Sequence, residues 1–168
     1  MASENGSDSG IRLVEASDLT ALVVRSLTAN GISLPHAESI ASVAVAAERD
    51  GSRSHGLYRL AGCIAAVRAK RIDGHAEPKP PLRSGSVLKV DCQGGFAPLA
   101  MARNRAMLVE VARERGFAAL VLNNCYHFTA LWTDVEPVAA SGMAVLEVVT
   151  GANCVVWPGA RQALLGTN

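Results

Sequence analysis

Apolar residues recur at the spacing of an α-helix through the first part of the chain. Leu19, Val23 and Leu27 fall on one face of the first stretch, and a glycine at position 31 ends it. The same periodicity continues after Ser33, which is suited to begin a helix, and again after a short turn flanked by glycines. We therefore predict three helices, over residues 17–30, 34–50 and 56–70.

The pattern changes after a proline-rich connector at 78–81. Short apolar runs now alternate with a helical stretch that Pro98 begins and Gly116 ends. Strands are predicted over 86–90, 117–122, 143–150 and 154–157, and helices over 98–115 and around Pro137. This order, helices first and then alternating strands and helices, predicts the α/β class.

Three parts are expected along the chain. Residues 1–12 are rich in Ser, Gly, Asn and Asp and are expected to form a disordered tail. Residues 13–83 form a helical segment, and residues 84–168 form the alternating β/α segment. Because Gly166-Thr167-Asn168 follows an apolar pair with no polar tail, we expect this last segment to be incomplete.

Composition narrows the classes of function. Hydrophobic residues make up 49% of the 168 and charged residues 18%, so the chain can bury a sizeable core. The formal net charge is +1 and no basic stripe is present, which argues against nucleic acid as a partner. The longest apolar run is far too short to cross a membrane. Four well-separated cysteines without a C-x-x-C pair indicate reduced thiols in a cytoplasmic protein.

A polar turn between the second and third predicted helices is the first candidate site. It places Ser54, His55 and Arg59 within six positions, next to Gly56. His55 can exchange a proton near neutral pH, and Arg59 offers a planar guanidinium suited to a carboxylate or phosphate. With His55 near the N-cap, free backbone amides would also favour an anion. The alternative is structural, with Ser54 and His55 capping the helix and Arg59 forming a surface ion pair.

The second candidate site is the loop at 123–132, which follows a predicted buried strand. Ligands often bind in such loops in α/β folds, and the amides of Thr129 and Ala130 are expected to face a phosphate. Packing is the alternative for a loop that is rich in aromatic residues. Cys125 and His127 lack further ligands at metal spacing, so no metal is expected.

Other polar residues are expected to have no role in a site. Asp134 and Glu136 are expected to be exposed helix charges, and His36 and His75 to be surface residues. No G-x-G-x-x-G motif is present, since the glycine pair at 94–95 lacks the third glycine. A dinucleotide that binds here is therefore not held by a Rossmann fingerprint.

Together these residues resemble the malate/L-lactate dehydrogenase-like oxidoreductases, whose nucleotide-binding domain is not a Rossmann fold. The resemblance is carried by Ser54-His55-Gly56 with Arg59, by the loop at His127 and by Gly166-Thr167-Asn168. Within that family, residues 127–137 are most similar to the cyclic-imine branch, the Δ1-piperideine-2-carboxylate and Δ1-pyrroline-2-carboxylate reductases.

The resemblance implies a cytoplasmic homodimer with a non-Rossmann α/β fold. It implies that NADPH, or NADH, reduces a cyclic imino acid to L-pipecolate or L-proline. Ser54 and His55 would form the catalytic proton relay. Contacts to cofactor or substrate would come from Arg59, His127, Phe128, Thr129, Ala130 and Leu131.

Two alternatives remain open. One is an NAD-dependent 2-hydroxyacid dehydrogenase of the same family, acting on a malate-like or lactate-like substrate and its 2-oxoacid. The other is a fragment of either enzyme that is inactive alone, because members of the family are longer than this chain.

Overall fold

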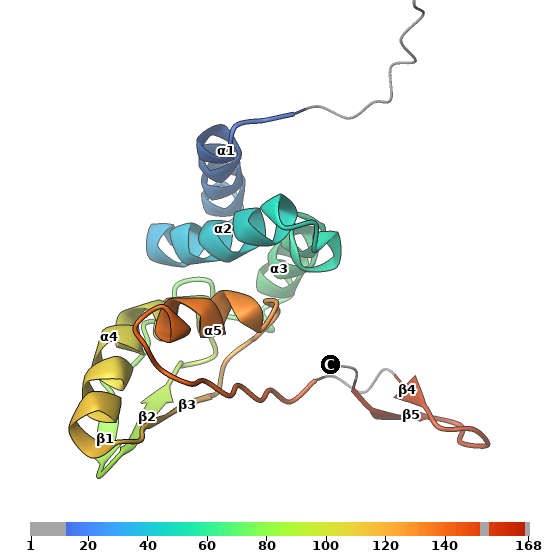
Figure 1. Ribbon diagram of the computed structural model, residues 1–168. Coiled ribbons are helices and arrows are strands. Elements are labelled where there is room, and N and C mark those ends of the chain that lie inside the picture. Colours follow the sequence, from blue (N-terminus) through green and yellow to red (C-terminus); the bar gives the residue numbers. More distant parts are fainter. Residues whose placement is uncertain (1–12, 152–154, 167–168) are drawn as a thin grey trace, which may run out of the picture.

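The computed structural model describes residues 13–151 and 155–166. Three helices come first, followed by a small mixed sheet with two further helices, and a β-hairpin closes the described part (Figure 1). This order confirms the predicted α/β class. The tail expected at 1–12, Cys154 and the last two residues of the Gly-Thr-Asn ending lie outside the described residues.

The three predicted helices are present as α1 (Ala16–Thr28), α2 (Leu34–Arg49) and α3 (Tyr58–Arg68). Gly31 has a φ of 81°, a left-handed conformation that glycine adopts easily, and it turns the chain between α1 and α2. Ser33 occupies the N-cap position of α2, but its side chain makes no capping hydrogen bond. The periodicity thus located the helices, whereas the expected serine cap does not form.

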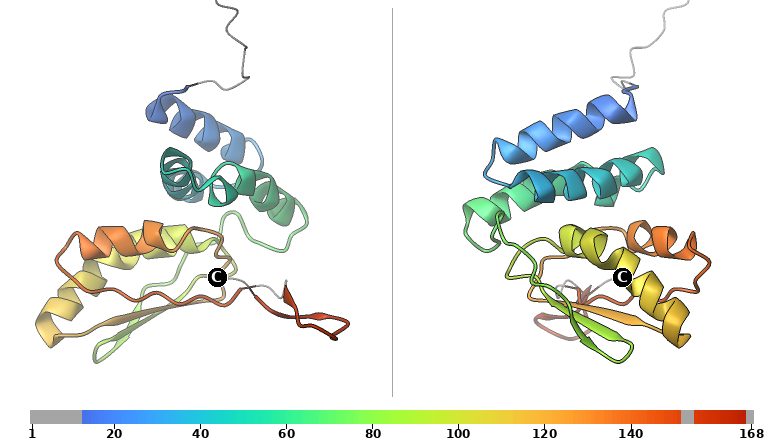
Figure 2. Two further views of the ribbon diagram at one scale, coloured as in Figure 1. Left: turned by 45° about the vertical axis from the view of Figure 1, so that its right-hand side comes forward. Right: turned by 90° about the vertical axis from the view of Figure 1, so that its left-hand side faces the viewer.

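The sheet has the strand order β1-β2-β3. β1 (Leu82–Ser84) runs antiparallel to β2 (Val87–Asp91), and β2 runs parallel to β3 (Ala119–Asn123) through the connecting helix α4 (Ala97–Arg115). Both α4 and α5 (Trp132–Ala139) lie between the sheet and the α1–α3 segment (Figure 2). The carboxyl ends of β2 and β3 therefore point the same way, and the second candidate loop follows the end of β3.

One strand prediction was wrong, and one strand of the last hairpin was missed. Residues 143–150 form no strand, although their side chains alternate between half-buried and exposed. That alternation arises from packing on one side only, and no strand among residues 13–151 and 155–166 pairs with them. The strand predicted over 154–157 is confirmed as β4 (Val155–Val156), and its hairpin partner β5 (Ala163–Leu165) was missed.

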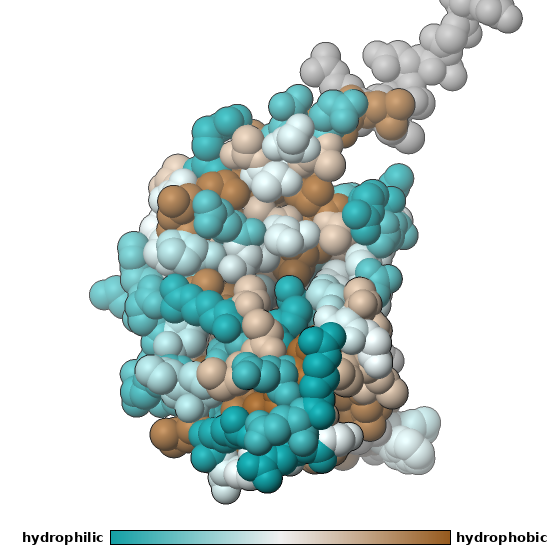
Figure 3. Space-filling model, turned by 60° about the vertical axis from the view of Figure 1, so that its left-hand side comes forward, coloured by the Kyte–Doolittle hydropathy of each residue, from teal (hydrophilic) through white to brown (hydrophobic). Residues whose placement is uncertain are grey.

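Most charged side chains of the described residues lie on the surface. Arg113, Glu114 and Arg115 are exposed at the end of α4, and hydrophilic side chains gather over the lower part of the face shown in Figure 3. Among the described residues, no helix is both long and apolar enough to span a lipid bilayer.

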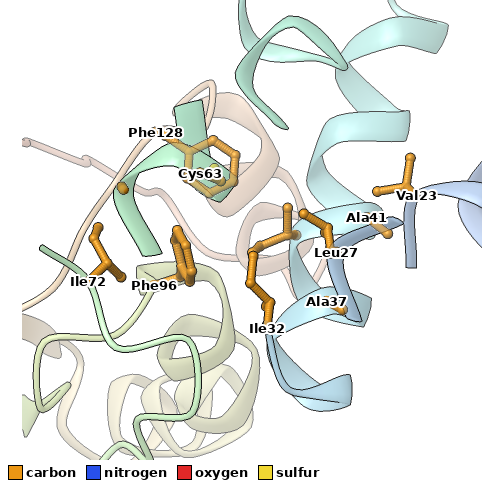
Figure 4. Packing of buried hydrophobic residues seen from close by; sticks show 11 residues of the cluster. Val23, Leu27, Ile32, Ala37, Ala41, Cys63, Ile72, Phe96 and Phe128 are labelled. Carbon is orange, nitrogen blue, oxygen red and sulfur yellow. The ribbon is translucent and has the colours of Figure 1, made fainter. Parts of the chain in front are cut away.

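A single cluster of buried side chains joins the helical segment to the β/α segment. Phe96, at the start of α4, and Phe128, in the second candidate loop, pack beside Cys63 of α3 and Ile32 (Figure 4). Fully burying one phenylalanine stabilises a fold by about 1.5–3 kcal/mol. These two aromatic rings therefore hold the second candidate loop against α3.

His36 is fully buried in this region, so the expectation that it lies on the surface was wrong. Its Nε2–H donates a hydrogen bond to the carbonyl of Ala76 at 2.8 Å, and its ring meets Phe96 edge to face. Burial lowers the pKa of His36, so the ring is neutral at neutral pH. Gly95 makes room for this contact, because a Cβ there would lie 3.1 Å from the imidazole and 2.8 Å from the Cβ of Ala76.

We predict that Gly95→Ala destabilises the protein by about 1–3 kcal/mol, because the added methyl overpacks the contact between His36 and Ala76. Urea unfolding measures the change. Gly62→Ala in α3 is the matched control, since no atom lies within 4 Å of its added Cβ. The control should be neutral or stabilising by up to about 1 kcal/mol. Equal stability of the two variants would contradict the prediction.

Candidate active site

The turn that carries Ser54 and His55 is anchored by Glu48 near the end of α2. The Glu48 Oε1 atom accepts a hydrogen bond from the backbone amide of Leu57 at 2.7 Å. Gly56 is buried beside this contact, and a Cβ at that position would collide with the Glu48 carboxylate. The carboxylate thus reaches the first amide before α3 only because residue 56 has no side chain.

The sequence predicted that His55 lies near the N-cap of α3, and the structure places it elsewhere. It ends a short 3-10 helix, η1 (Arg53–His55), and Leu57 is the N-cap residue of α3. Ser54 Oγ lies 3.0 Å from His55 Nδ1, so the serine and the imidazole share a hydrogen bond. The sequence paired these two residues correctly, although their local geometry differs from the prediction.

His55 is poised as a neutral imidazole. Partial burial lowers its pKa, and the positive charges of Arg59 and His127 lower it further. With Nδ1 engaged by Ser54, Nε2 remains for a ligand. The side chain can therefore exchange a proton through Nε2 while Ser54 holds the ring from the other side.

Arg59 presents an unmet hydrogen-bonding group at this place. Its Nε is buried and has no partner within residues 13–151 and 155–166. Over the same residues it forms no ion pair, so the predicted alternative of a surface ion pair does not describe it. A buried guanidinium nitrogen without an acceptor favours an anionic ligand.

The second candidate loop is organised around a charged histidine. His127 Nε2 lies 2.9 Å from Thr129 Oγ1 and 3.3 Å from Asp134 Oδ2, and Glu147 Oε1 is 3.6 Å away. Burial alone would lower the pKa of His127, but hydrogen bonding and charge from Asp134 and Glu147 outweigh it and raise the pKa to about 9. His127 is therefore an imidazolium at neutral pH.

Asp134 was expected to be an exposed helix charge, and that prediction was wrong. Its side chain is only 4% exposed, and it also accepts a hydrogen bond from Thr129 Oγ1 at 3.0 Å. A carboxylate in the first turn of α5 is favoured by the helix dipole, and here it also turns inward to the imidazolium. No local pattern marked this contact in the sequence, because His127 lies in the loop before α5 and Asp134 lies within the helix.

The remaining predicted contact residues are those at 128–131. Their side chains pack within the loop, and two of their backbone amides are available to a ligand. Phe128, Thr129 and Ala130 are buried, and Leu131 is half-buried. Within the part of the chain that the structure describes, the backbone amides of Thr129 and Ala130 donate no hydrogen bond to a protein acceptor. Any ligand contact from Thr129 and Ala130 therefore comes from the backbone.

The structure brings the two candidate sites together. The charge of His127 acts on His55, and Phe128 packs in the same cluster as Cys63, which lies one turn of α3 beyond Arg59. A proton-exchanging imidazole is thus placed near two cationic groups. Such a set can bind an anion and move a proton beside it.

His127, Asp134 and Glu147 also form the one group of potential metal ligands among the described residues, with ligand atoms within 4.8 Å of one another. A metal ion would have to displace the proton of His127. The hydrogen-bonded imidazolium accounts for the cluster without a metal, and the absence of a metal stays a prediction. Glu147 was not a candidate before, because no spacing links it to the loop.

Comparison with known proteins gives consistent relatives. A profile of the malate/L-lactate dehydrogenase family matches residues 14–168. The Δ1-pyrroline-2-carboxylate reductase of Ancylobacter novellus is 44% identical over 142 residues, which cover 84% of this chain and 42% of that protein. A Δ1-pyrroline-2-carboxylate/Δ1-piperideine-2-carboxylate reductase of Pseudomonas putida is 39% identical over 162 residues, 96% of this chain and 48% of the relative.

Solved structures show the same fold. The Δ1-piperideine-2-carboxylate reductase of Pseudomonas syringae superimposes with a TM-score of 0.83 at 36% identity, covering 93% of this chain and 47% of that one. A malate dehydrogenase of Pyrococcus horikoshii, at 23% identity and a TM-score of 0.72, covers 85% of this chain and 41% of its own and supports the fold alone. This chain thus spans about half the length of the curated relatives that it matches. It belongs to the malate/L-lactate dehydrogenase family of oxidoreductases, as the resemblance in its sequence predicted.

Proposed function

We propose that this chain carries the proton-transfer and anion-binding part of an NAD(P)H-dependent reductase of cyclic imino acids. The substrates are Δ1-piperideine-2-carboxylate and Δ1-pyrroline-2-carboxylate, and the products are L-pipecolate and L-proline. The observation that carries the proposal is the convergence of three groups: neutral His55, hydrogen-bonded to Ser54; the Nε of Arg59, which has no partner among the described residues; and protonated His127. The names of the relatives support the choice of substrate.

The site offers what a cyclic imino acid requires. Its carboxylate needs a cation, and Arg59 has a buried nitrogen that finds no acceptor in the described part of the chain. Reduction of its C=N bond adds a hydride to C2 and a proton to the ring nitrogen. His55 delivers the proton from Nε2, and Ser54, 3.0 Å from Nδ1, holds the ring and can pass on a replacement proton.

A nicotinamide cofactor fits the second loop. When bound, the nicotinamide supplies the hydride. The amides of Thr129 and Ala130, which donate to no protein acceptor among the described residues, suit a phosphate of NADPH or NADH. Protonated His127 partly offsets the negative charges of Asp134 and Glu147 beside them. The buried side chain of Phe128 holds this loop backbone in place. NADPH is our choice, and the homodimer, the cytoplasmic location and the division into segments at 13–83 and 84–168 stay predictions.

A 2-hydroxyacid dehydrogenase of the same family is the second candidate. Arg59 and His55 would serve a 2-oxoacid equally well, because it also carries a carboxylate beside an atom that accepts a proton. The group reduced would then be C=O. The wider family, whose profile matches malate and L-lactate dehydrogenases, keeps this candidate open.

The substrate class is tested with the full chain, NADPH and each of four substrates. We expect NADPH oxidation with Δ1-piperideine-2-carboxylate and Δ1-pyrroline-2-carboxylate and little with oxaloacetate or pyruvate, followed by absorbance. Turnover of the 2-oxoacids alone would favour the second candidate. Binding of NADPH, measured by calorimetry, without any turnover would identify an inactive fragment. Absence of both would contradict the proposal.

Substitutions separate the roles of His55 and Arg59. We predict that His55→Gln lowers kcat by about 10²–10⁴-fold with little change in KM, because a proton donor is lost. Arg59→Gln should raise KM by about 10-fold or more, because a charged hydrogen bond to the carboxylate is lost. Arg53→Gln, in the same turn and exposed, is the matched control and should leave both constants unchanged. Wild-type kinetics in both His55→Gln and Arg59→Gln would show that the turn has only a structural role.

The charge of His127 gives cofactor binding a pH dependence. Because the pKa of His127 is raised to about 9, the imidazolium is present below that pH and is lost as the pH rises through it. We predict that the Kd for NADPH increases through this range. In Asp134→Asn the increase should begin at lower pH, because the main partner of the imidazolium is neutral. Glu147→Gln, at the longer distance of 3.6 Å, should shift it less. Identical pH profiles in all three proteins would exclude His127 as the titrating group.

A further inference from the structure

Two cysteines that the proposed reaction does not use face each other at the carboxyl ends of β2 and β3. Cys92 follows β2 and is fully buried, and Cys125 follows β3 and is half-buried. Cys125 packs against the cluster formed by Val90, Cys92 and Ala100. The Cys125 side chain therefore lies beside Cys92 within one packed cluster. They therefore form a pair, although they are far apart in the sequence.

The backbone fixes this pair from both sides. The amide of Cys92 donates to the carbonyl of Asn123 at 3.0 Å, and the amide of Tyr126 donates to Gly95 at 2.9 Å. Between them, Asn124 has a φ of 54°, which breaks the alternation of side chains along β3. Cys125 thereby returns to the face that Cys92 occupies. Adjacent strands lie about 4.7–4.9 Å apart, a separation that a disulfide can bridge.

We propose that Cys92 and Cys125 are a redox-active dithiol that a hydroperoxide converts into a disulfide. The Cys125 thiolate attacks one oxygen of hydrogen peroxide, the O–O bond breaks, and a sulfenic acid and hydroxide form. The Cys92 thiol then attacks the sulfenic sulfur, an S–S bond forms, and the S–O bond breaks. With the protons of the two thiols, the peroxide leaves as two waters. An added dithiol returns the two electrons.

The surroundings assign the first step to Cys125. The neighbouring Cys92 thiol and the positive charge of His127 lower the pKa of the Cys125 thiol, which favours the thiolate that reacts. The neighbouring Cys125 thiol and burial raise the pKa of Cys92. Cys63 is an internal control, because it is buried in the main core and burial raises its pKa to about 12.

The disulfide would act on the loop that begins at Cys125. An S–S bond is about 2.05 Å long, much shorter than the separation of two thiols in contact, so closure pulls Cys125 toward β2. His127 lies two residues further along and would move with it. The consequence for cofactor affinity rests on the proposed function, whereas formation of the disulfide does not.

The chemical test uses the full chain, reduced and then treated with hydrogen peroxide. Free thiols are alkylated under denaturing conditions, and the protein is digested with trypsin and a protease that cuts after glutamate. Glu136 and Glu147 lie between Cys125 and Cys154, so the digest separates these two cysteines. We expect a cross-linked pair of peptides containing Cys92 and Cys125 that disappears on addition of dithiothreitol, while Cys63 is alkylated throughout.

Variants identify the order of the steps. In Cys92→Ala, Cys125 should remain as a sulfenic acid that reacts with dimedone, whereas Cys125→Ala should give neither product. Cys63→Ala, the matched control, should leave the cross-link unchanged. Alkylation of both Cys92 and Cys125 after peroxide treatment, or a link from Cys125 to Cys154, would overturn the proposal.

A separate experiment tests the functional consequence. It measures the affinity of the reduced and of the oxidised protein for NADPH. We expect a severalfold weaker affinity after oxidation, restored by dithiothreitol and absent in Cys92→Ala. A cross-link that forms without changing the affinity would confirm the dithiol and reject its control of the loop. Failure of the reduced protein to bind NADPH would count against the proposed function alone.

Discussion

The site depends on the packing of Phe96 and Phe128 against the helical segment. These rings come from the start of α4 and from the loop after β3, and they share a core with Cys63 and Ile32. This contact holds the loop of His127 near the turn of His55. The two regions are more than 70 positions apart in sequence, and each alone contains only a few polar residues. Hydrophobic burial, which has no direction of its own, therefore brings together groups whose chemistry is strongly directional.

Charge at the site is divided between two histidines with opposite environments. His127 is surrounded by carboxylates and stays protonated, whereas His55 lies near cations and stays neutral. Titratable groups whose surroundings push their pKa values apart commonly take different roles in catalysis. Here the charged ring is fixed by Thr129 and Asp134, and the neutral ring has a free nitrogen. The same residue type thus provides a permanent cation at one point and a proton carrier at another.

Much of the fold could be predicted from local signals. The helices and β2 follow from periodicity, and Gly116, with a φ of 77°, ends α4 as expected. The pairing of Ser54 with His55 also followed from proximity in sequence. The inward positions of His36 and Asp134 could not be predicted in this way, because both depend on partners supplied by other elements. His36 is buried through Ala76 and Gly95, and Asp134 through His127. The strand predicted over residues 143–150 was wrong for a related reason. Alternation of apolar and polar residues indicates that one face is buried, but it does not show whether a neighbouring strand exists.

The close fit of Glu48 and Gly56 limits how this protein can diverge. Any side chain at position 56 would expel the carboxylate, and an aspartate at position 48 would be one methylene too short to reach the amide of Leu57. A substitution at either position alone would break the hydrogen bond to the amide of Leu57, so we expect substitutions at the two positions to occur together. A designer who reshapes the surroundings of His55 for a new substrate inherits the same restriction. Diversity is more readily introduced at exposed Arg53 and Tyr58, which line the same turn without supporting it.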